Sequence, residues 1–555
     1  MNRLTVRTDW GKMPGRIRPD ESGFTNDLVE LKVDRIHSFT SGRKNLFYNP
    51  DTGVLCSMVG YISNLDELRS RYSFSGESDT ELVVRLYYLI GPQVIEVLDG
   101  IFTVFIWDGK KQQGYLFQDE HASNLPLYYA GTKEQAVAST SLKEVLKEMP
   151  PGRELDLAAV YDFLEAKLIV PNESTFIKGV KKLCPGQYIL IDRARNSFTV
   201  RPLRRRAKKV PGAYARSNLI KSLGDSVKGL YKRVDADDLF CTLSGGFDSN
   251  IVLSFLSGSG KHVKAVTIGG KEKNEIPNAK ELAGCYENVE HEGYLVEEDM
   301  LNLLPDMIWR LEGYTCQRGL FLQYELAEQL AGSRAGNIFL GDCADQALDR
   351  YRLSLFHNTV KRIKKLLRRF SSGKSRDDIL EALLRKKRSA RCGKRWLPLK
   401  KFDADLDCIL KKSGIMLNSF GVQGVYPFLN RNTITIARAL GRGNRQKTFY
   451  KEKVLEALGE ERSRLIRKEW GDTDIEYLFE GKKDIVSRLL GSAFARDVLG
   501  EESIRDIAAS LVENCDLVLR ILFVYVFNEL FVSGKFDAKF DQGHIDVKLE
   551  ELLPA

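Results

Sequence analysis

The chain has 555 residues, a formal net charge of +9 and a hydrophobic content of 43%. This length exceeds what one hydrophobic core usually serves, so two or three domains are expected, and the composition excludes a disordered protein. Nine irregularly spaced cysteines without a CxxC pair, and six histidines without HxH or HExxH, argue against a disulfide framework or a zinc site and favour a reduced, cytoplasmic protein.

No segment of the chain is expected to enter a membrane. The start, Met1–Leu4, lacks the apolar stretch of a signal peptide. The most apolar run, Ile521–Phe527, is too short to span a bilayer and predicts a buried helix or strand.

The positive charge is concentrated in residues 361–401. This segment has 17 Lys or Arg and three acidic residues, a net of +14, so the rest of the chain carries about −5. Such a block is either a solvated helical face or a docking site for something anionic, such as a peptide, a protein, RNA or a membrane surface. Only Phe370 and Trp396 are aromatic there, which disfavours stacking on single-stranded nucleic acid, and no nucleic-acid partner is expected.

Residues 1–200 are predicted to form a first domain of mostly short strands. Residues 53–62 and 100–109 are rich in β-branched and aromatic residues and are bounded by Gly and Asp, as strands often are. Residues 78–91 and 155–166 have apolar residues at helical spacing and predict helices.

A change of pattern marks the second domain, residues 214–555. Residues 201–213 are charged, contain Pro-Gly and have few apolar residues, so they are interpreted as a linker. Strands and helices then alternate, which predicts a parallel sheet covered on both faces. The expected strands are 238–243, 263–268 and 336–340, and the expected helices are 250–256, 278–283, 300–313 and 321–330.

The sequence TLSGGFDSN, residues 242–250, follows the first of these strands. It is either a tight strand-to-helix turn or a cradle for an anion, because ligands bind where the strands of a parallel sheet end and a helix N-terminus attracts negative charge. Gly245 and Gly246 would let an anion approach the backbone, while Ser244 and Ser249 would add donors. The Lys of a GxxxxGK[ST] loop is absent.

Two acidic residues are expected at the same edge of the sheet. Asp248 lies inside the loop, and Asp345 follows the strand of NIFLGDCADQ, residues 337–346. An acidic residue within an anion cradle would be repulsive unless a cation such as Mg²⁺ bridged it to phosphates. The alternative is that the two residues cap separate turns and helices.

Several motifs in this order resemble the asparagine synthetase superfamily, which includes β-lactam synthetases and lasso-peptide cyclases. SGGFDS is similar to the pyrophosphate loop of N-type ATP pyrophosphatases, and GDCADQ is similar to the family's GxGxDE stretch. VYPFLNR, residues 425–431, resembles its RxPFLD segment, and LIRKEWGD, residues 465–472, resembles its late lysine loop.

The N-terminal part resembles the family's amidotransferase domain. The similar segments are residues 60–69, 77–83, 98–108 and 177–192. The resemblance implies an α+β sandwich of the Ntn amidotransferase type, followed by an α/β parallel-sheet ATP-pyrophosphatase domain with a helical C-terminal part.

The resemblance also implies roles for individual residues. ATP would be held by Leu243, Ser244, Gly245, Gly246, Asp248, Ser249, Ile268, Leu340 and Gly341. Asp248 and Asp345 would hold Mg²⁺. Asp342 takes the position that asparagine synthetases fill with Glu and β-lactam synthetases with Tyr, which assists acyl-adenylate formation or proton transfer. Lys468 would stabilise negative charge in the transition state.

The chain departs from the family where glutamine would be hydrolysed. The family's glutaminases need a Cys at the extreme N-terminus, whereas Met1, Asn2 and Arg3 stand there and the first cysteine is Cys56. The family's oxyanion Asn-Gly is Val59-Gly60, although Asn64 and Asp79 match the pocket region and are expected to remain as turn and cap residues. The N-terminal domain is therefore predicted to be a structural remnant.

The predicted function is an ATP-dependent carboxylate–amine ligase that forms AMP and pyrophosphate without hydrolysing glutamine. The amine would belong to the substrate itself, as in lasso-type peptide macrolactam cyclases, because a tethered amine attacks at a high effective concentration. The expected partners are a peptide carrying its own amine and a leader-binding or protease protein. An asparagine synthetase that uses ammonia and a non-catalytic scaffold remain as alternatives.

Overall fold

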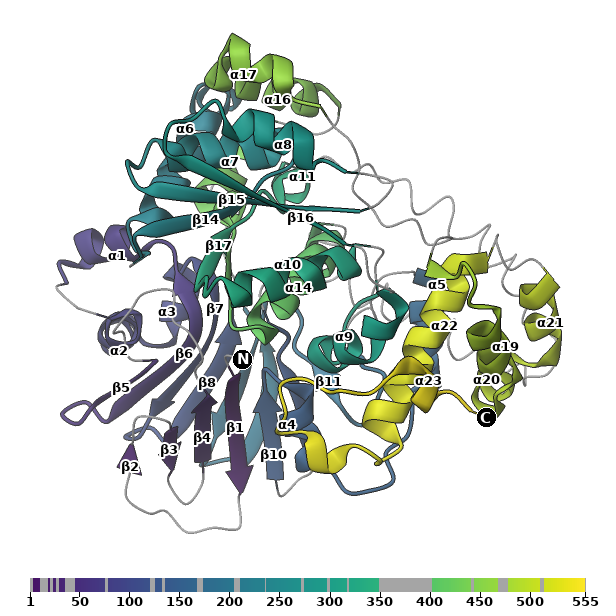
Figure 1. Ribbon diagram of the computed structural model, residues 1–555. Coiled ribbons are helices and arrows are strands. Elements are labelled where there is room, and N and C mark those ends of the chain that lie inside the picture. Colours follow the sequence, from purple (N-terminus) through teal and green to yellow (C-terminus); the bar gives the residue numbers. More distant parts are fainter. Residues whose placement is uncertain are drawn as a thin grey trace.

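The computed structural model shows two sheet-containing domains and a group of C-terminal helices (Figure 1). It describes residues 3–9, 18–19, 23–25, 29–34, 45–74, 78–119, 125–131, 135–166, 173–203, 210–234, 236–270, 274–296, 300–316, 319–348, 402–440, 444–467, 478–509 and 514–554. The basic segment 361–401, Lys468 and residues 204–209 of the expected linker lie outside these residues.

Two antiparallel sheets build the N-terminal domain. The first has the order β11-β9-β10-β1-β4-β3-β2 and the second has the order β13-β12-β8-β7-β6-β5. The strands of the first sheet are β1 (Arg3–Asp9), β2 (Arg18–Pro19), β3 (Gly23–Thr25), β4 (Val29–Asp34), β9 (Tyr128–Gly131), β10 (Gln135–Ser139) and β11 (Lys181–Lys182). Those of the second are β5 (Leu46–Asn49), β6 (Val54–Ile62), β7 (Gly100–Asp108), β8 (Gln113–Gln118), β12 (Gln187–Asp192) and β13 (Ser197–Pro202).

The helices of this domain are α1 (Leu65–Tyr72), α2 (Asp79–Ile90), α3 (Val94–Val97), α4 (Leu142–Lys147) and α5 (Leu157–Ala166). Strand β6 shows why the layers form, because its side chains alternate between the two faces of the sheet. Leu55, Val59 and Tyr61 enter the core between the sheets, whereas Cys56 and Met58 enter a separate core beneath α2. The expected strands and helices of this region are confirmed.

The second domain has a parallel sheet with the order β16-β15-β14-β17-β18. Its strands are β14 (Asp238–Thr242), β15 (His262–Gly269), β16 (Val289–Leu295), β17 (Asn337–Phe339) and β18 (Gln423–Val425). Its helices are α6 (Gly212–Tyr231), α7 (Phe247–Ser257), α8 (Ile276–Ala283), α9 (Leu304–Leu311), α10 (Leu320–Gly332), α11 (Ala344–Ala347), α14 (Phe402–Ser419), α15 (Arg431–Ala439), α16 (Asn444–Leu458) and α17 (Glu460–Leu465). The fold class expected from the sequence is thus confirmed.

Three details differ from the sequence-based expectation. Helix α7 begins at Phe247 rather than Asn250, so Asp248 and Ser249 lie in its first turn. Strand β16 was not expected because its sequence, VEHEGYL, is polar, and it can be polar because it forms an edge of the sheet. Strand β18 was not expected because it has only three residues, one of which is Gly.

The C-terminal helices pack against the N-terminal domain. They are α19 (Lys483–Gly491), α20 (Ala493–Leu499), α21 (Glu501–Ala509), α22 (Cys515–Phe527) and α23 (Leu549–Leu552). Helix α22 contains the apolar run noted in the sequence and lies beside α5 (Figure 1), with the rings of Phe163 and Phe523 5.6 Å apart. No helix among the described residues is long and apolar enough to cross a membrane.

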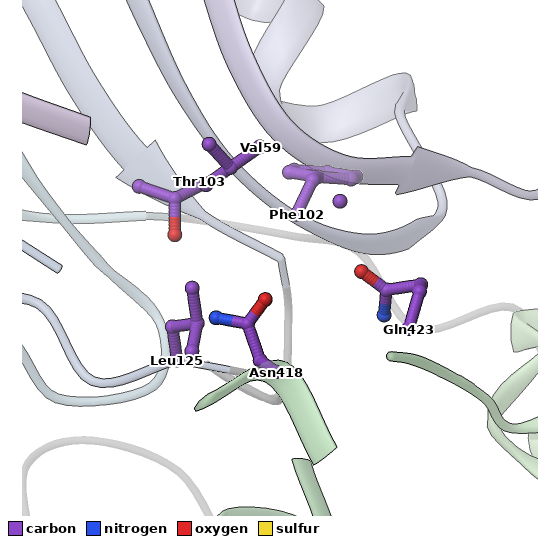
Figure 2. Close-up of a pocket in the computed structure, with 7 residues that line it drawn as sticks. Val59, Phe102, Thr103, Leu125, Asn418 and Gln423 are labelled. Atoms are coloured by element: carbon purple, nitrogen blue, oxygen red, sulfur yellow. The ribbon is translucent and has the colours of Figure 1, made fainter. Parts of the chain in front are cut away.

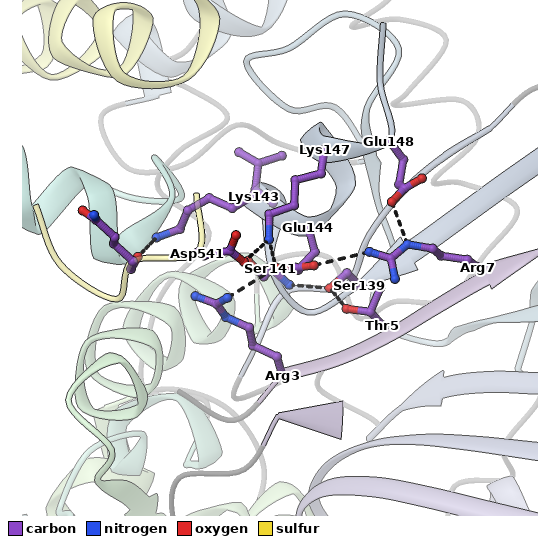
Figure 3. Close-up of polar contacts among 12 residues, drawn as sticks. Arg3, Thr5, Arg7, Ser139, Ser141, Lys143, Glu144, Lys147, Glu148 and Asp541 are labelled. Carbon is purple, nitrogen blue, oxygen red and sulfur yellow. Dashed lines mark hydrogen bonds and ion pairs between the residues drawn. The ribbon is translucent and has the colours of Figure 1, made fainter. Parts of the chain in front are cut away.

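A polar cluster on α4 joins strand β1 to the C-terminal segment (Figure 3). The buried carboxylate of Glu144 pairs with Arg3 at 3.4 Å and with Lys147 at 2.6 Å, and Lys147 also pairs with Asp541. The neighbouring Lys143 is fully buried and donates to the carbonyl oxygen of Gln542 at 3.4 Å. The last segment of the chain therefore closes over the N-terminal domain.

Candidate active site

The candidate site lies where the winding of the parallel sheet reverses. Strand β14 runs between β15, which follows it, and β17, which comes later in the chain, so the helical connections leave in opposite directions. The SGGFDS loop follows β14 and GDCADQ follows β17. Such a switch point is where open α/β sheets bind their ligands.

Serine side chains brace the SGGFDS loop from within. The hydroxyls of Ser244 and Ser249 are 3.0 Å apart, and the amide of Ser244 donates to the Ser249 hydroxyl at 3.0 Å. The amide of Gly246 donates to the Ser244 hydroxyl at 3.2 Å. These two loop amides are therefore satisfied within the loop, whereas an anion cradle would need them to face the ligand. The buried Asn250 donates to the carbonyl oxygens of Ser244 and Gly246.

GDCADQ lies directly against this loop. A Cβ at Gly341 would be 2.7 Å from the amide nitrogen of Ser249 and 2.9 Å from the carbonyl carbon of Asp248, so no larger residue fits there. Glycine thus allows the ends of β14 and β17 to approach one another. The contact brings together the two loops that carry Asp248 and Asp345.

Asp342 is partly buried next to Gly341. Its Oδ2 is shielded from solvent and accepts no hydrogen bond from the part of the chain that the structure describes. The following residue, Cys343, has φ of +72°, a conformation that non-glycine residues adopt rarely and that is often found at functional sites. Burial, and then the charge of Asp342, raise the pKa of the Cys343 thiol, so this thiol is a poor nucleophile.

Helix α16 and the residues that follow α17 contact the same loop and the start of α7. The hydroxyl of Tyr450, on α16, donates to Oδ1 of Asp248 at 2.9 Å. A Cβ at Gly245 would overlap the carbonyl oxygen of Arg467 and would lie 2.6 Å from the side-chain amide of Asn278. Lys468 lies outside the described residues, but Arg467, which precedes it, is in contact with the loop. No motif in the sequence indicated Tyr450.

The three apolar residues expected around the nucleotide lie on neighbouring strands of the parallel sheet. Ile268 belongs to β15, whereas Leu243 and Leu340 directly follow β14 and β17. The amide of Leu243 donates to Val266, and that of Leu340 donates to Val425, which extends the sheet to the edge of the site. All three side chains belong to the core or pack against it.

Thr267 links this edge to His291. Its hydroxyl donates to the carbonyl oxygen of Leu243 at 2.7 Å and lies 2.9 Å from Nε2 of His291. Because a hydroxyl has one proton, Nε2 is the donor in the second contact. Burial, and then the charge of Lys280, lower the pKa of His291, which favours the neutral ring.

A second candidate region lies between the domains, at Val59 and Gly60. Figure 2 shows Val59 and Thr103 opposite Asn418 across a small cavity. Its volume of about 10 Å³ is enough for roughly one water molecule. Val59 has no side-chain donor, and Cys56, three residues earlier, faces the helix-covered side of the sheet. Burial, and then the charge of Asp79, raise the pKa of the Cys56 thiol.

Asp79 and Asn64 have structural partners. Both oxygens of Asp79 lie 2.8 Å from Nη2 of Arg233, in the second domain, and Oδ2 also accepts from the amide of Ile62. Asn64 precedes α1 without capping it, and instead bridges the amide of Asp99 and the carbonyl oxygen of Val97. Asn64 is thus a turn residue at the N-cap position of α1, as expected, but its side chain does not cap the helix, and Ser78 rather than Asp79 caps α2.

The donor set at the switch point suits a hard cation held jointly with phosphates. Carboxylates such as those of Asp248 and Asp345 are the oxygen ligands that Mg²⁺ prefers, and one or two of them usually suffice when phosphates complete the shell. Among the described residues there is no group of three or more His, Cys, Asp or Glu that could hold a metal by itself. Two carboxylates fit a metal–nucleotide complex, in which phosphates complete the shell of the metal.

Comparisons with known proteins agree with this geometry. A glutamine amidotransferase domain model matches residues 19–201, and an asparagine synthase model matches residues 219–440. The chain is 24% identical over 356 residues to "Asparagine synthetase [glutamine-hydrolyzing] 1" of Bacillus subtilis (strain 168), covering 60% of this chain and 54% of that protein. It is 25% identical over 362 residues to "Asparagine synthetase B [glutamine-hydrolyzing]" of Escherichia coli (strain K12), covering 60% and 59%.

A relative with a different name is "Amidase chyE" of Penicillium rubens. The identity is 27% over 277 residues, which cover 48% of this chain and 40% of that protein. The chain spans little more than half the length of the two synthetases, and less of the amidase.

Proposed function

The chain belongs to the asparagine synthetase superfamily, and from this premise we propose that it is an ATP-dependent ligase that joins a carboxyl group to an amine and forms AMP and pyrophosphate. The observation that carries the proposal is the contact of Gly341 with Asp248 and Ser249. This contact brings the SGGFDS loop, which resembles a pyrophosphate-binding loop, against the GDCADQ loop, which carries Asp345, at the switch point of the sheet.

In the proposed reaction, the substrate carboxylate attacks the α-phosphorus of ATP, and the bond to the leaving pyrophosphate breaks. The amine then attacks the acyl carbon and AMP leaves. The SGGFDS loop and the N-terminus of α7 hold the leaving pyrophosphate, because helix N-termini favour negative charge. Asp248 and Asp345 would hold Mg²⁺, which neutralises phosphate charge.

Asp342 and Lys468 are assigned to the chemical steps. The buried Oδ2 of Asp342, which has no donor among the described residues, would accept the proton that the attacking amine loses. Lys468 would stabilise the charge that develops at the acyl-phosphate bond. Its assignment is supported by Arg467, whose carbonyl oxygen touches Gly245.

We further propose that the N-terminal domain does not hydrolyse glutamine. The curated relatives are named as glutamine-hydrolysing enzymes. In this chain Val59 offers no oxyanion donor, and Asp79 is engaged by Arg233. Loss of one oxyanion donor typically lowers the rate about 10²–10³-fold.

The amine would then belong to the substrate, which makes a peptide macrolactam of the lasso type the preferred product. The basic segment 361–401 supports a peptide substrate through its charge, and a leader-binding or protease partner would accompany it. The second candidate is an asparagine synthetase that uses ammonia, which the names of the relatives favour.

Exchange of labelled pyrophosphate into ATP tests the proposal. Exchange is expected with a peptide that carries both an acidic side chain and a free N-terminal amine, and it should be lost in Asp248→Asn and Asp345→Asn. Exchange with aspartate, followed by asparagine formation from ammonia, would establish the second candidate. Release of glutamate from glutamine well above background would contradict the assignment of the N-terminal domain.

A further inference from the structure

Asp248 is held by a residue from a distant part of the chain. It is partly buried in the first turn of α7, where a short side chain can turn about two bonds. The hydroxyl of Tyr450 donates to its Oδ1 at 2.9 Å across 202 positions of sequence. A hydrogen bond to one oxygen fixes the plane of a carboxylate and so fixes the direction of the other oxygen.

Tyr450 is itself immobilised. Its side chain is 1% exposed, and its ring packs edge-to-face with Phe428 at 6.3 Å between centroids. The next residue, Lys451, places its ammonium 4.8 Å from the ring centre of Phe247, which adjoins Asp248. Helix α16 therefore fits against the start of α7 through two consecutive side chains.

The same part of the chain touches the loop a second time. After α16 and α17 the chain returns to the loop, where the carbonyl oxygen of Arg467 packs against Gly245. The start of α7 and the loop are thus contacted both from the middle of α16 and from the residues that follow α17.

We propose that Tyr450 is a positioning residue that orients the Asp248 carboxylate for the divalent cation of a metal–nucleotide complex. This inference rests on the proposed function, because it needs a nucleotide at the loop. Groups that orient a metal-binding side chain typically contribute about 10–100-fold to metal affinity or activity.

The experiment measures metal affinity without turnover. Mn²⁺ is titrated into the full chain saturated with α,β-methylene ATP, and binding is followed by water proton relaxation. Tyr450→Phe removes only the hydroxyl and should weaken Mn²⁺ binding about tenfold or more. Binding of the analogue in EDTA should change less than about threefold, because the loop itself is intact.

Tyr87→Phe is the matched control. Tyr87 is also buried and donates to Oδ2 of Asp108 at 2.9 Å, but it lies in the N-terminal domain. This variant should bind Mn²⁺ and the analogue as the wild type does. Asp248→Asn should abolish the Mn²⁺ signal, and adding Tyr450→Phe to it should have no further effect.

Two results would overturn the inference and its premise separately. Mn²⁺ affinity of Tyr450→Phe within about twofold of the wild type, with intact binding of the analogue, would show that Tyr450 is only a packing residue. A wild-type chain that binds neither analogue nor metal would overturn the proposed function. If Tyr450→Phe does not fold, Phe428→Leu keeps the hydroxyl while loosening its ring, and an unchanged Mn²⁺ affinity in that variant would also count against the inference.

Discussion

Replacing Arg233 by Met should destabilise the protein strongly, because it breaks a buried ion pair between the two domains. The side chains of Arg233 and Asp79 are only 8% and 9% exposed, and Nη2 lies 2.8 Å from both carboxylate oxygens. Met retains much of the apolar volume of Arg but has no charge. The substitution therefore removes the guanidinium while Asp79 stays in place.

The expected loss follows from the carboxylate left behind. The amide of Ile62 still donates to Asp79 at 3.1 Å, but a neutral donor does not replace a positive charge in a buried position. Removing one partner of a buried ion pair typically costs about 3–5 kcal/mol. We therefore expect a loss of about this size in the free energy of unfolding.

Urea unfolding of the full chain, followed by tryptophan fluorescence and circular dichroism, measures the loss. Arg85→Met is the control, because Arg85 pairs with Glu81 at 2.7 Å on α2, the helix that begins at Asp79, and the Arg85 side chain is 42% exposed. An exposed pair of this kind contributes up to about 1 kcal/mol. If Arg233→Met cost no more than Arg85→Met, Asp79 would not depend on Arg233, and its assignment as a structural residue would be refuted.

Three further predictions concern single residues. Lys468→Ala should lower kcat about 10²–10³-fold with little change in the KM for ATP, measured by pyrophosphate release, whereas a rise in KM alone would make Lys468 a ground-state contact. Lys143→Met should stabilise the protein most below pH 7, because burial lowers the pKa of Lys143 from 10.5 to about 7. Between pH 7 and pH 10.5 the unfolded chain binds a proton at Lys143 that the folded chain lacks, so the stability of the wild type rises with pH. The stability gained by Lys143→Met should therefore shrink by about 1.4 kcal/mol per pH unit over this range. A gain in urea unfolding that does not depend on pH would contradict this. Cys56 should resist iodoacetamide at pH 8 in the folded protein, because it is fully buried and burial raises the pKa of its thiol. Cys285 should react, because it is only partly buried, although burial raises its pKa as well. Equal labelling of the two, read by mass spectrometry, would show that Cys56 is accessible.

The sequence was most informative where structure depends on neighbours along the chain. Strands β6 and β7 are long and apolar, so their pattern was sufficient to predict them. The sequence pattern predicts the start of α7 three residues too late, because Gly-Phe-Asp-Ser has the composition of a loop. In the structure Gly246 is the residue before the helix, and the negative charge of Asp248 suits its first turn. Strand β16 escaped prediction because an edge strand need not be apolar.

Partners that are distant in sequence could not be predicted. Asp79 and Arg233 are 154 positions apart, and Tyr450 and Asp248 are 202 apart. Sequence motifs located Asp248 and Asp79, but nothing in the neighbouring sequence indicates that Tyr450 and Arg233 are their partners. The site could therefore be predicted as a set of loops, whereas the side chains that hold those loops required the structure.

The interface between the domains gives a reason for a glutaminase-like fold to be retained under the proposal that this domain does not hydrolyse glutamine. The segment VYPFLNR borders β18, and it also docks on the N-terminal domain. The amide of Tyr426 donates to the hydroxyl of Tyr61 at 3.2 Å, and the amide of Arg431 donates to Asp99 at 2.9 Å. These contacts hold the segment whose first residue, Val425, receives the amide of Leu340 at the edge of the candidate site.

The apolar core also joins the two domains, because one continuous cluster of buried side chains runs through both of them. It includes Val59 and Phe105 of the sandwich, Leu243 and Leu340 of the parallel sheet, and Phe523 of α22. Removing the sandwich would expose this surface to water at a cost of roughly 25 cal/mol per Å². Under the proposed function, selection on the ligase site alone would then be enough to preserve the N-terminal fold, because Val59 contributes to this core through packing and not as a hydrogen-bond donor.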